Sequence, residues 1–163
     1  MVAEDEALLC NIYASTREQE LGLLDWTPEQ KKAFVRMQFE AQTTYYRQVY
    51  PDMEYTIILH DGEEAGRMMV AQLEDEFRLV DITILPAHRN AGIGRTMLRQ
   101  LMDRAAGEGK MVRLHIEQFN RARRLYENLG FRDVADKGVY IMMEWQPGTA
   151  LEGVNREPLQ EQR

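Results

Sequence analysis

The sequence is poor in cysteine, and Cys10 is the only one among its 163 residues. A lone cysteine excludes an internal disulfide and a cysteine-based metal cluster. Cys10 lies on the apolar stripe of a helix expected at residues 4–15, so we expect it to be a small buried hydrophobe rather than a nucleophile. The three histidines lack the spacing of metal ligands, and the sequence therefore predicts no metal site.

Long apolar runs and an excess of positive charge are also missing. No stretch approaches the roughly 18 apolar residues that a membrane-spanning helix needs. The residues after Met1 are acidic and lack the basic-then-apolar layout of a signal peptide, so we expect a cytoplasmic protein. The net charge of −7 argues against a nucleic-acid partner and suits a cationic small molecule or a peptide amine.

Length and composition predict one domain with a real core. The chain is 44% hydrophobic, and we see no internal repeat. We expect the domain to cover residues 1–146. Residues 147–163, where Gly, Pro, Glu and Gln dominate, are expected to form a flexible tail.

The hydrophobic period changes along the chain and predicts an α/β protein. Helices are expected at residues 4–15, 28–49, 92–106 and 120–129, and strands at 55–59, 67–73, 77–85, 111–117, 131–135 and 139–145. Thr27, Pro28 and Gln30 are typical of a helix start, and this helix should carry one stripe of Phe34, Met37, Ala41 and Tyr45. Asp61-Gly62 and Lys137-Gly138 predict hairpin turns. This order of elements predicts a mixed sheet with helices on both faces.

The most informative segment is Ile82–Arg95, where a buried strand runs into a loop whose two glycines open a helix. Unpaired N–H groups and the helix dipole favour an anion at a helix start, and glycines let a phosphate approach the backbone. A Walker loop would need Lys where Arg95 stands, and a dinucleotide fingerprint would need glycine in place of Met97. The alternative is a tight strand-to-helix turn that uses glycine only for packing.

Two motifs in order resemble the GNAT acetyltransferase family. Arg89-Asn90-Ala91-Gly92-Ile93-Gly94, with Ile84-Leu85-Pro86 before it, is similar to the family signature Arg/Gln-x-x-Gly-x-Gly/Ala. The segment from Asn120 to Phe131 resembles the family block Asn-x-x-Ala-x-x-Leu-Tyr-x-x-x-Gly-Phe. The resemblance covers about residues 4–145 and implies a GNAT-like mixed, mostly antiparallel central sheet, splayed between two strands and flanked by helices.

The sequence departs from the family pattern in two places. Family members often have glycine directly after the signature arginine, where this chain has Asn90. The family's first strand precedes the helix expected at 4–15, and Met1 leaves no room for it. Either the start is truncated, or the sheet opens one strand short.

The resemblance implies an N-acetyltransferase that moves acetyl from acetyl-CoA to a primary amine of a small molecule or peptide by direct attack. The CoA pyrophosphate would be held by the loop amides of Arg89, Asn90, Ala91, Gly92, Ile93, Gly94 and Arg95. The backbone of Ile82 and Ile84 would pair with the pantetheine arm, and Asn120 and Tyr126 would lie beside the thioester. A non-catalytic acyl-CoA-binding or regulatory module on the same fold is the alternative. We also expect a homodimer, since many relatives pair and a missing strand would leave an open edge.

Catalysis needs a neutral amine and a proton for the leaving thiolate. By resemblance Tyr126 is the acid; the alternative is inward packing with Ala122, Leu125 and Leu129. For the base, His115 titrates near neutral pH, but it also fits a polar strand face with Arg113 and Glu117. Asp81 is the competing base, because it interrupts an apolar strand face, where it could instead anchor a loop through hydrogen bonds.

Other polar and aromatic residues are harder to assign. We expect His60 and His88 to be solvated in turns. Tyr45, Tyr46 and Arg47 near the end of the long helix either line the acceptor pocket or pack against the domain.

Overall fold

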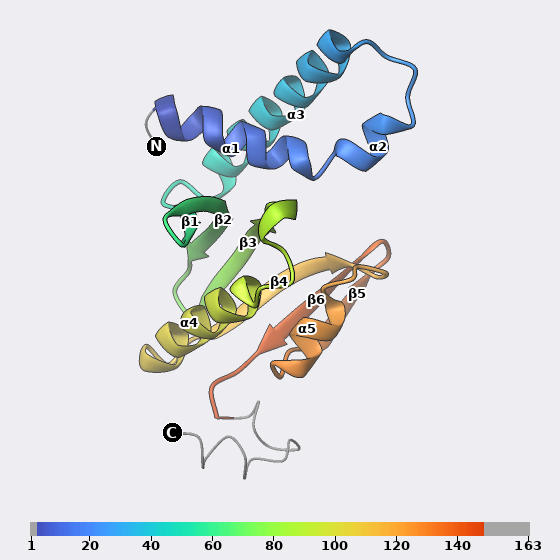
Figure 1. Cartoon of the computed structure of the whole chain (residues 1–163). Coiled ribbons are helices and arrows are strands. Elements are labelled where there is room, and N and C mark those ends of the chain that lie inside the picture. Colours follow the sequence, from blue (N-terminus) through green and yellow to red (C-terminus); the bar gives the residue numbers. More distant parts are fainter. Residues whose placement is uncertain (1–2, 149–163) are drawn as a thin grey trace. The chain divides into compact units, whose positions relative to one another are not determined.

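The structure, a computed structural model, describes residues 3–148 (Figure 1). Its helices are α1 Ala3–Ser15, α2 Glu18–Gly22, α3 Pro28–Val49, the 3₁₀ turn η1 Pro86–His88, α4 Ile93–Gly107 and α5 Arg123–Asn128. Its strands are β1 Glu54–His60, β2 Glu63–Gln72, β3 Glu76–Ile84, β4 Met111–Glu117, β5 Arg132–Lys137 and β6 Tyr140–Trp145. The predicted α/β class is confirmed, and the tail expected at 147–163 lies almost wholly outside the described residues.

The six strands form one mixed sheet in the order β1-β2-β3-β4-β6-β5. Strand β3 pairs in parallel with β4, while β1–β2, β4–β6 and β5–β6 are antiparallel, as expected. By its contacts the chain divides into two compact units: one runs to Ala71 and adds Asp81–Ile93, and the other combines Gln72–Val80 with the chain from Gly94 onward.

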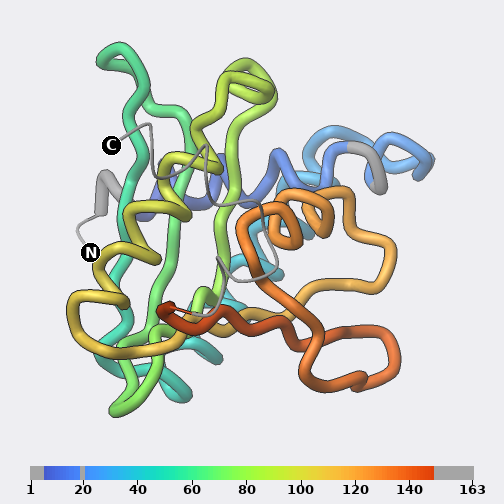
Figure 2. The backbone as a smooth tube through the Cα atoms, turned by 90° about the horizontal axis from the view of Figure 1, so that it is seen from below, coloured from blue at the N-terminus to red at the C-terminus, as the bar shows by residue number. Residues whose placement is uncertain are grey.

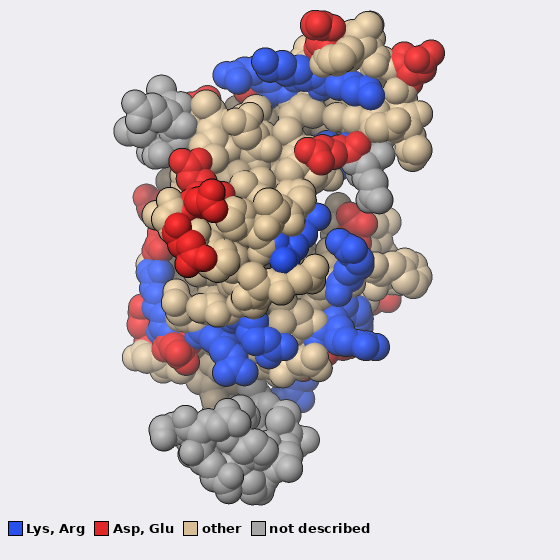
Figure 3. All heavy atoms as spheres, in the orientation of Figure 1, with Lys and Arg blue, Asp and Glu red and all other residues tan. Residues whose placement is uncertain are grey.

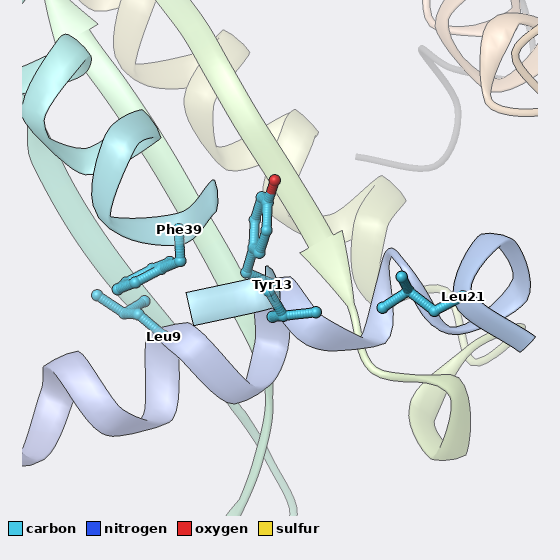
Figure 4. Close-up of a cluster of buried hydrophobic side chains, with 5 residues drawn as sticks. Leu9, Tyr13, Leu21 and Phe39 are labelled. Atoms are coloured by element: carbon cyan, nitrogen blue, oxygen red, sulfur yellow. The ribbon is translucent and has the colours of Figure 1, made fainter. Parts of the chain in front are cut away.

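In the first unit, helices α1, α2 and α3 build a core with β1. Thr27 caps α3 through the predicted capping box with Gln30. The buried cluster consists of Leu9, Tyr13, Leu21, Val35 and Phe39. Figure 4 shows Leu9 of α1 beside Phe39 of α3, and Cys10 packs half-buried against this cluster. Each fully buried side chain of this size contributes about 1.5–3 kcal/mol relative to exposure.

The predicted stripe on α3 holds only at Phe34, which packs half-buried against the core cluster. Met37 and Tyr45 are each 59% exposed, and the buried positions are Val35, Phe39 and Thr43. The inward face is set by packing, because the ring of Phe39 contacts Tyr13 of α1 with centroids 6.0 Å apart. Two residues along a helix rotate the side chain by about 200°, so Met37 points away when Val35 and Phe39 point inward.

Two helices also differ from the prediction. Helix α2 was not predicted. Helix α5 begins at Arg123 rather than near residue 120. The reason lies in Asn120, whose side-chain Oδ1 accepts from the Ala122 amide at 2.7 Å and forms a turn before the helix.

The β1–β2 hairpin positions the chain that follows β3. Asp61 and Gly62 both have positive φ, +54° and +80°, as a two-residue hairpin turn requires. The register shifts between Ile58 and Leu59 and leaves Ala65 as the extra residue of a bulge. The Ala65 carbonyl accepts from the Leu85 amide at 2.7 Å.

Gly66 allows a close approach between two backbones of this unit. A Cβ built on Gly66 would lie 2.1 Å from the Thr83 carbonyl oxygen, a distance that no real Cβ reaches. Strand β2 therefore needs glycine where it meets the end of β3, and this approach brings Ala65 within reach of Leu85.

In the second unit, α4 buries Leu98, Leu101, Met102 and Ala105. Phe77 of β3 is fully buried, with the guanidinium of Arg104 4.8 Å from its ring centroid. Basic side chains gather over α4 (Figure 3). Strand β3 pairs with β4 through Glu76–Leu79 and Met111–Leu114.

No helix within residues 3–148 is both long and apolar enough to cross a membrane.

We expect Gly66→Ala to lower the free energy of unfolding by at least about 3 kcal/mol, because the new Cβ collides with backbone rather than with a movable side chain. Urea denaturation measures this. Gly107→Ala is the matched control: a Cβ there meets nothing within 4 Å, so stability should change by less than about 1 kcal/mol. Equal effects of the two substitutions would contradict the close contact.

Candidate functional site

The loop after β3 is a strand-to-helix connection, as the sequence predicts. The turn η1 follows β3, with the Arg89 amide donating to the Pro86 carbonyl at 3.3 Å. The Arg89 side chain turns back, and its Nε donates to the Ile84 carbonyl at 2.9 Å. Figure 2 shows this loop and the β1–β2 turn projecting at the same end of the first unit.

The backbone of the loop explains its residues. Asn90 has φ +64° and Gly92 has φ +80°, both in the left-handed region. Asparagine is among the few residues with a side chain that tolerate this region, which accounts for Asn90 where relatives often have glycine. The departure noted in the sequence is therefore conformationally mild.

Packing alone does not account for the two signature glycines. A Cβ on Gly92 would meet nothing within 4 Å, and one on Gly94 would meet only Leu125 at an ordinary 3.9 Å. Gly92 is required by its positive φ, while Gly94 leaves open space at the first turn of α4. The first four N–H groups of a helix lack intrahelical partners, and the dipole is positive there. The residues present therefore fit an anion such as a phosphate.

Asp81 is tied to a buried arginine. Its Oδ2 accepts from Arg67 Nε at 2.9 Å and from Thr83 Oγ1 at 3.0 Å. The Arg67 side chain is only 3% exposed, and its guanidinium lies 5.8 Å from the Tyr13 ring centroid. Burial, followed by the Asp81 charge, raises the pKa of the nearby Tyr46 phenol. Asp81 is thus held by hydrogen bonds, as the alternative to a base expects, but its partners lie on β2 and β3 rather than in a loop.

Sequence reasoning missed Arg67, although a signal was present. Arg67 is the only charged residue in the run from Ala65 to Ala71, and Asp81 is the only one among Leu79–Leu85. Two opposite charges isolated in neighbouring apolar strands predict a buried ion pair, since each needs compensation.

His115 lies on the exposed face of β4, between Arg113 and Glu117. Partial burial, then the cationic groups of Arg78 and Lys137, lower the pKa of His115 below the ordinary histidine value, and Glu76 opposes them. His115 is therefore neutral near pH 7 and can accept a proton. Within residues 3–148 no group of three or more His, Cys, Asp or Glu side chains is arranged to hold a metal ion.

Ion pairs cross the strands next to His115. Arg113 contacts Glu144 at 2.7 Å and Glu76 at 3.2 Å, and Arg78 contacts Glu76 at 2.9 Å. Burial alone would raise the pKa of Glu144, but hydrogen bonds from Arg113 and Gln146 outweigh it and lower this pKa. The network joins β3, β4 and β6 and fixes the strand that carries His115.

Tyr126 and Asn120 occupy the predicted helix segment. Tyr126 is 5% exposed, and its ring meets Phe131 edge-on with centroids 5.6 Å apart. This contact agrees with the packing alternative. The predicted roles of Tyr126 as acid and of Asn120 beside the thioester stay predictions.

A cleft of about 480 Å³ lies at the carboxyl end of β4 and is lined by Glu117, Gln118, Phe119, Gly138 and Val139. Gln118 Nε2 donates to the Gly138 carbonyl at 2.8 Å and joins the β4–α5 loop to the β5–β6 turn. Phe119 is 95% exposed and Val139 is 68% exposed. The sequence prediction missed this cleft; an aromatic residue in a short polar loop was the available signal.

The expectation that His60 and His88 are solvated in turns is wrong. His60 ends β1, His88 ends η1, both are half-buried, and their Nδ1 atoms lie 3.4 Å apart. In helix α3, Tyr45 is exposed, and its ring contacts that of the half-buried Tyr46 at a tilt of 58°, with ring centroids 5.6 Å apart.

Residues 51–133 match the family model described as an acetyltransferase (GNAT) domain. Over 78 residues the chain is 30% identical to the [ribosomal protein bS18]-alanine N-acetyltransferase of Haemophilus influenzae. That alignment covers 47% of this chain and 53% of the relative, so the match spans about half of that protein's length.

Solved structures share the fold. The PaiA N-acetyltransferase of Thermoplasma acidophilum, solved with coenzyme A, superposes with a TM-score of 0.68 at 16% identity, covering 90% of this chain and 95% of that one. The ribosomal-protein-S18-alanine N-acetyltransferase of Escherichia coli gives a TM-score of 0.58 at 20% identity, with 90% of each chain covered.

Asn90→Val should lower the free energy of unfolding by about 1–2 kcal/mol, because a β-branched residue is strained at positive φ. Asn90→Gly is the matched control and should change it by less than about 0.5 kcal/mol, since glycine adopts this region freely. Urea denaturation of both variants gives the comparison. A valine variant as stable as the glycine variant would show that residue 90 is not held in this conformation.

Proposed function

Because the chain belongs to the GNAT acetyltransferase family, we propose that it transfers the acetyl group of acetyl-CoA to a primary amine. The observation that carries this proposal is the loop from Arg89 to Gly94. It combines the family signature with two left-handed residues, open space at Gly92 and the start of a 15-residue helix. These features suit a diphosphate, which acetyl-CoA carries.

The loop residues would hold the cofactor through their backbone. In this proposal the amides of Arg89–Arg95 bind the pyrophosphate, and the backbone of Ile82 and Ile84 pairs with the pantetheine arm. Arg89 already donates to the Ile84 carbonyl, so its side chain stabilises the loop from the strand side. Acetyl-CoA, when bound, supplies the activated acyl group as a thioester.

The chain's own residues would manage two protons. The amine nitrogen attacks the thioester carbonyl carbon, the carbon–sulfur bond breaks, and CoA leaves as a thiolate that takes a proton. His115 is the preferred base, since its lowered pKa keeps it neutral near pH 7. Asp81 is disfavoured, because its Oδ2 is occupied by Arg67 and Thr83. Tyr126 is proposed as the acid from its position in the family motif.

A peptide or protein amine is the acceptor class we favour. The curated relative and the Escherichia coli structure are both named as alanine N-acetyltransferases of a ribosomal protein. The cleft at the end of β4 offers exposed apolar groups, Phe119 and Val139, for a peptide side chain, with the Glu117 carboxylate beside them for a cationic group.

We expect the purified protein to release free thiol from acetyl-CoA when it is given a peptide that begins with alanine, and the peptide should gain the mass of one acetyl group. The same peptide with its N-terminus already acetylated is the control and should release none. A parallel panel of small amines tests the other acceptor class. Acetylation of a small amine alone would contradict the peptide preference.

Binding without turnover has to be distinguished from catalysis. Acetyl-CoA at about 100 times its Kd should stabilise the native state by about 2.7 kcal/mol and raise the Tm. Tyr126→Phe should keep this shift while its turnover falls by about 10²–10⁴-fold, the usual worth of a positioned acid. A Tm shift with no thiol release from any acceptor would favour the non-catalytic module. If acetyl-CoA caused no Tm shift and no acceptor released thiol, the proposal would be contradicted.

His115→Ala should remove the acidic limb of the turnover–pH curve and lower turnover near neutral pH by about 10²–10⁴-fold. A base works only when deprotonated, so the wild-type limb should lie below the ordinary histidine pKa of about 6.5, in line with the lowered pKa of His115. Asp81→Asn is the comparison. It should lower the Tm, because it removes the negative charge that pairs with buried Arg67, but it should leave the acidic limb of the turnover–pH curve unchanged. Loss of the limb in Asp81→Asn instead would assign the base to Asp81.

A further inference from the structure

Two histidines join the β1–β2 turn to the proposed cofactor loop. His60 is the last residue of β1, and His88 ends η1, directly before the signature residue Arg89. Their Nδ1 atoms lie 3.4 Å apart, and the rings meet edge to face with centroids 5.6 Å apart. The contact bridges 28 residues of sequence.

The chemistry of this contact depends on protonation. A neutral imidazole carries one N–H donor and one acceptor nitrogen, so two rings can share a hydrogen bond between their Nδ1 atoms when one holds its proton there. Two imidazolium rings have only donors and repel each other. The contact is therefore compatible with at most one charged ring.

The charged groups around the pair are unevenly distributed. Asp61 Oδ2 lies 3.7 Å from His60 Nε2, Glu63 is the cross-strand partner of His60, and Glu64 is opposite Leu59. Acidic side chains gather over this turn in Figure 3. Next to His88, Arg89 donates to the Ile84 carbonyl. The carboxylates that the structure places near the pair therefore lie on the His60 side.

We propose that His60 is a positioning residue: its bond to His88 holds η1 in the conformation from which the loop binds the cofactor, and double protonation of the pair releases it. The inference rests on the proposed function, because the loop is the proposed pyrophosphate site. The bond acts at the start of that loop, two residues before left-handed Asn90. Cofactor affinity should accordingly fall at acidic pH through this pair.

The pair itself is tested without cofactor. The chain has three histidines, so long-range nitrogen–proton NMR spectra can be assigned with one substitution per histidine. At about pH 7.5 the spectra should show a proton on Nδ1 of His60 or His88. This signature should vanish in His60→Ala. Both rings protonated only on Nε2 would overturn the proposal, whether or not the protein binds acetyl-CoA.

The positioning role is tested by the Kd of acetyl-CoA at about pH 7.5 and about pH 5.5, either side of the ordinary histidine range. His60→Asn places a non-titrating amide near the Nδ1 position. Between about pH 7.5 and about pH 5.5, the Kd of wild type should rise about three- to tenfold more than the Kd of His60→Asn. This factor is the usual worth of one hydrogen bond. His60→Ala should already be weakened by this factor at about pH 7.5.

Leu59→Ala is the matched control, because Leu59 is 63% exposed and adjacent to His60. It should keep the wild-type affinity and pH response. Comparing variants at each pH cancels the titration of acetyl-CoA itself. Identical pH responses in wild type and His60→Asn would overturn the positioning role. If the wild type shows the Nδ1 signature but does not bind acetyl-CoA, the proposed function is the error rather than the histidine pair.

Discussion

The close backbone contact between Gly66 and Thr83 is the constraint on which the candidate site depends. Only glycine lets β2 approach the end of β3 this closely, since a Cβ would lie 2.1 Å from the Thr83 oxygen. The bulge at Ala65 then presents a carbonyl to the Leu85 amide at 2.7 Å. The loop therefore starts from a fixed point, and its left-handed residues Asn90 and Gly92 turn the chain into α4. A phosphate site made of backbone amides needs this kind of support, because its donors have no side-chain freedom to adapt.

Charge placement separates structural from chemical roles among the polar residues. Arg67 and Asp81 form an ion pair in which the arginine is almost fully buried. Such a pair adds little net stability, but removing one partner leaves an uncompensated buried charge. His115 has the opposite character, since it is exposed and its neighbouring cations favour the neutral form. A neutral, exposed imidazole is suited to accept a proton, whereas a carboxylate bound to a guanidinium is suited to hold strands together.

Local signals in the sequence predicted the local features well. The capping box at Thr27, the hairpin turn at Asp61-Gly62 and the strand-loop-helix around Gly92 each depend on a few adjacent residues. The inward face of α3 was mispredicted, because it depends on which neighbours pack there, and those come from α1 and β1. The pairs Arg67–Asp81 and His60–His88 bridge 14 and 28 residues. Isolated opposite charges in apolar strands signalled the first pair, whereas no local pattern signalled the second. The proposed roles of Tyr126 and Asn120 come from the family motif, and packing alone would not have suggested them.

The most direct test of this account follows the backbone amides of residues 89–95 by nitrogen–proton NMR during titration with acetyl-CoA. Acetyl-pantetheine, which has the same thioester and arm but lacks the pyrophosphate, is the matched ligand. The account predicts large shifts of these amides with acetyl-CoA and small ones with acetyl-pantetheine, because the loop donates to the phosphates. Saturation with acetyl-CoA that leaves these amides unmoved would contradict the central claim that this loop binds the cofactor.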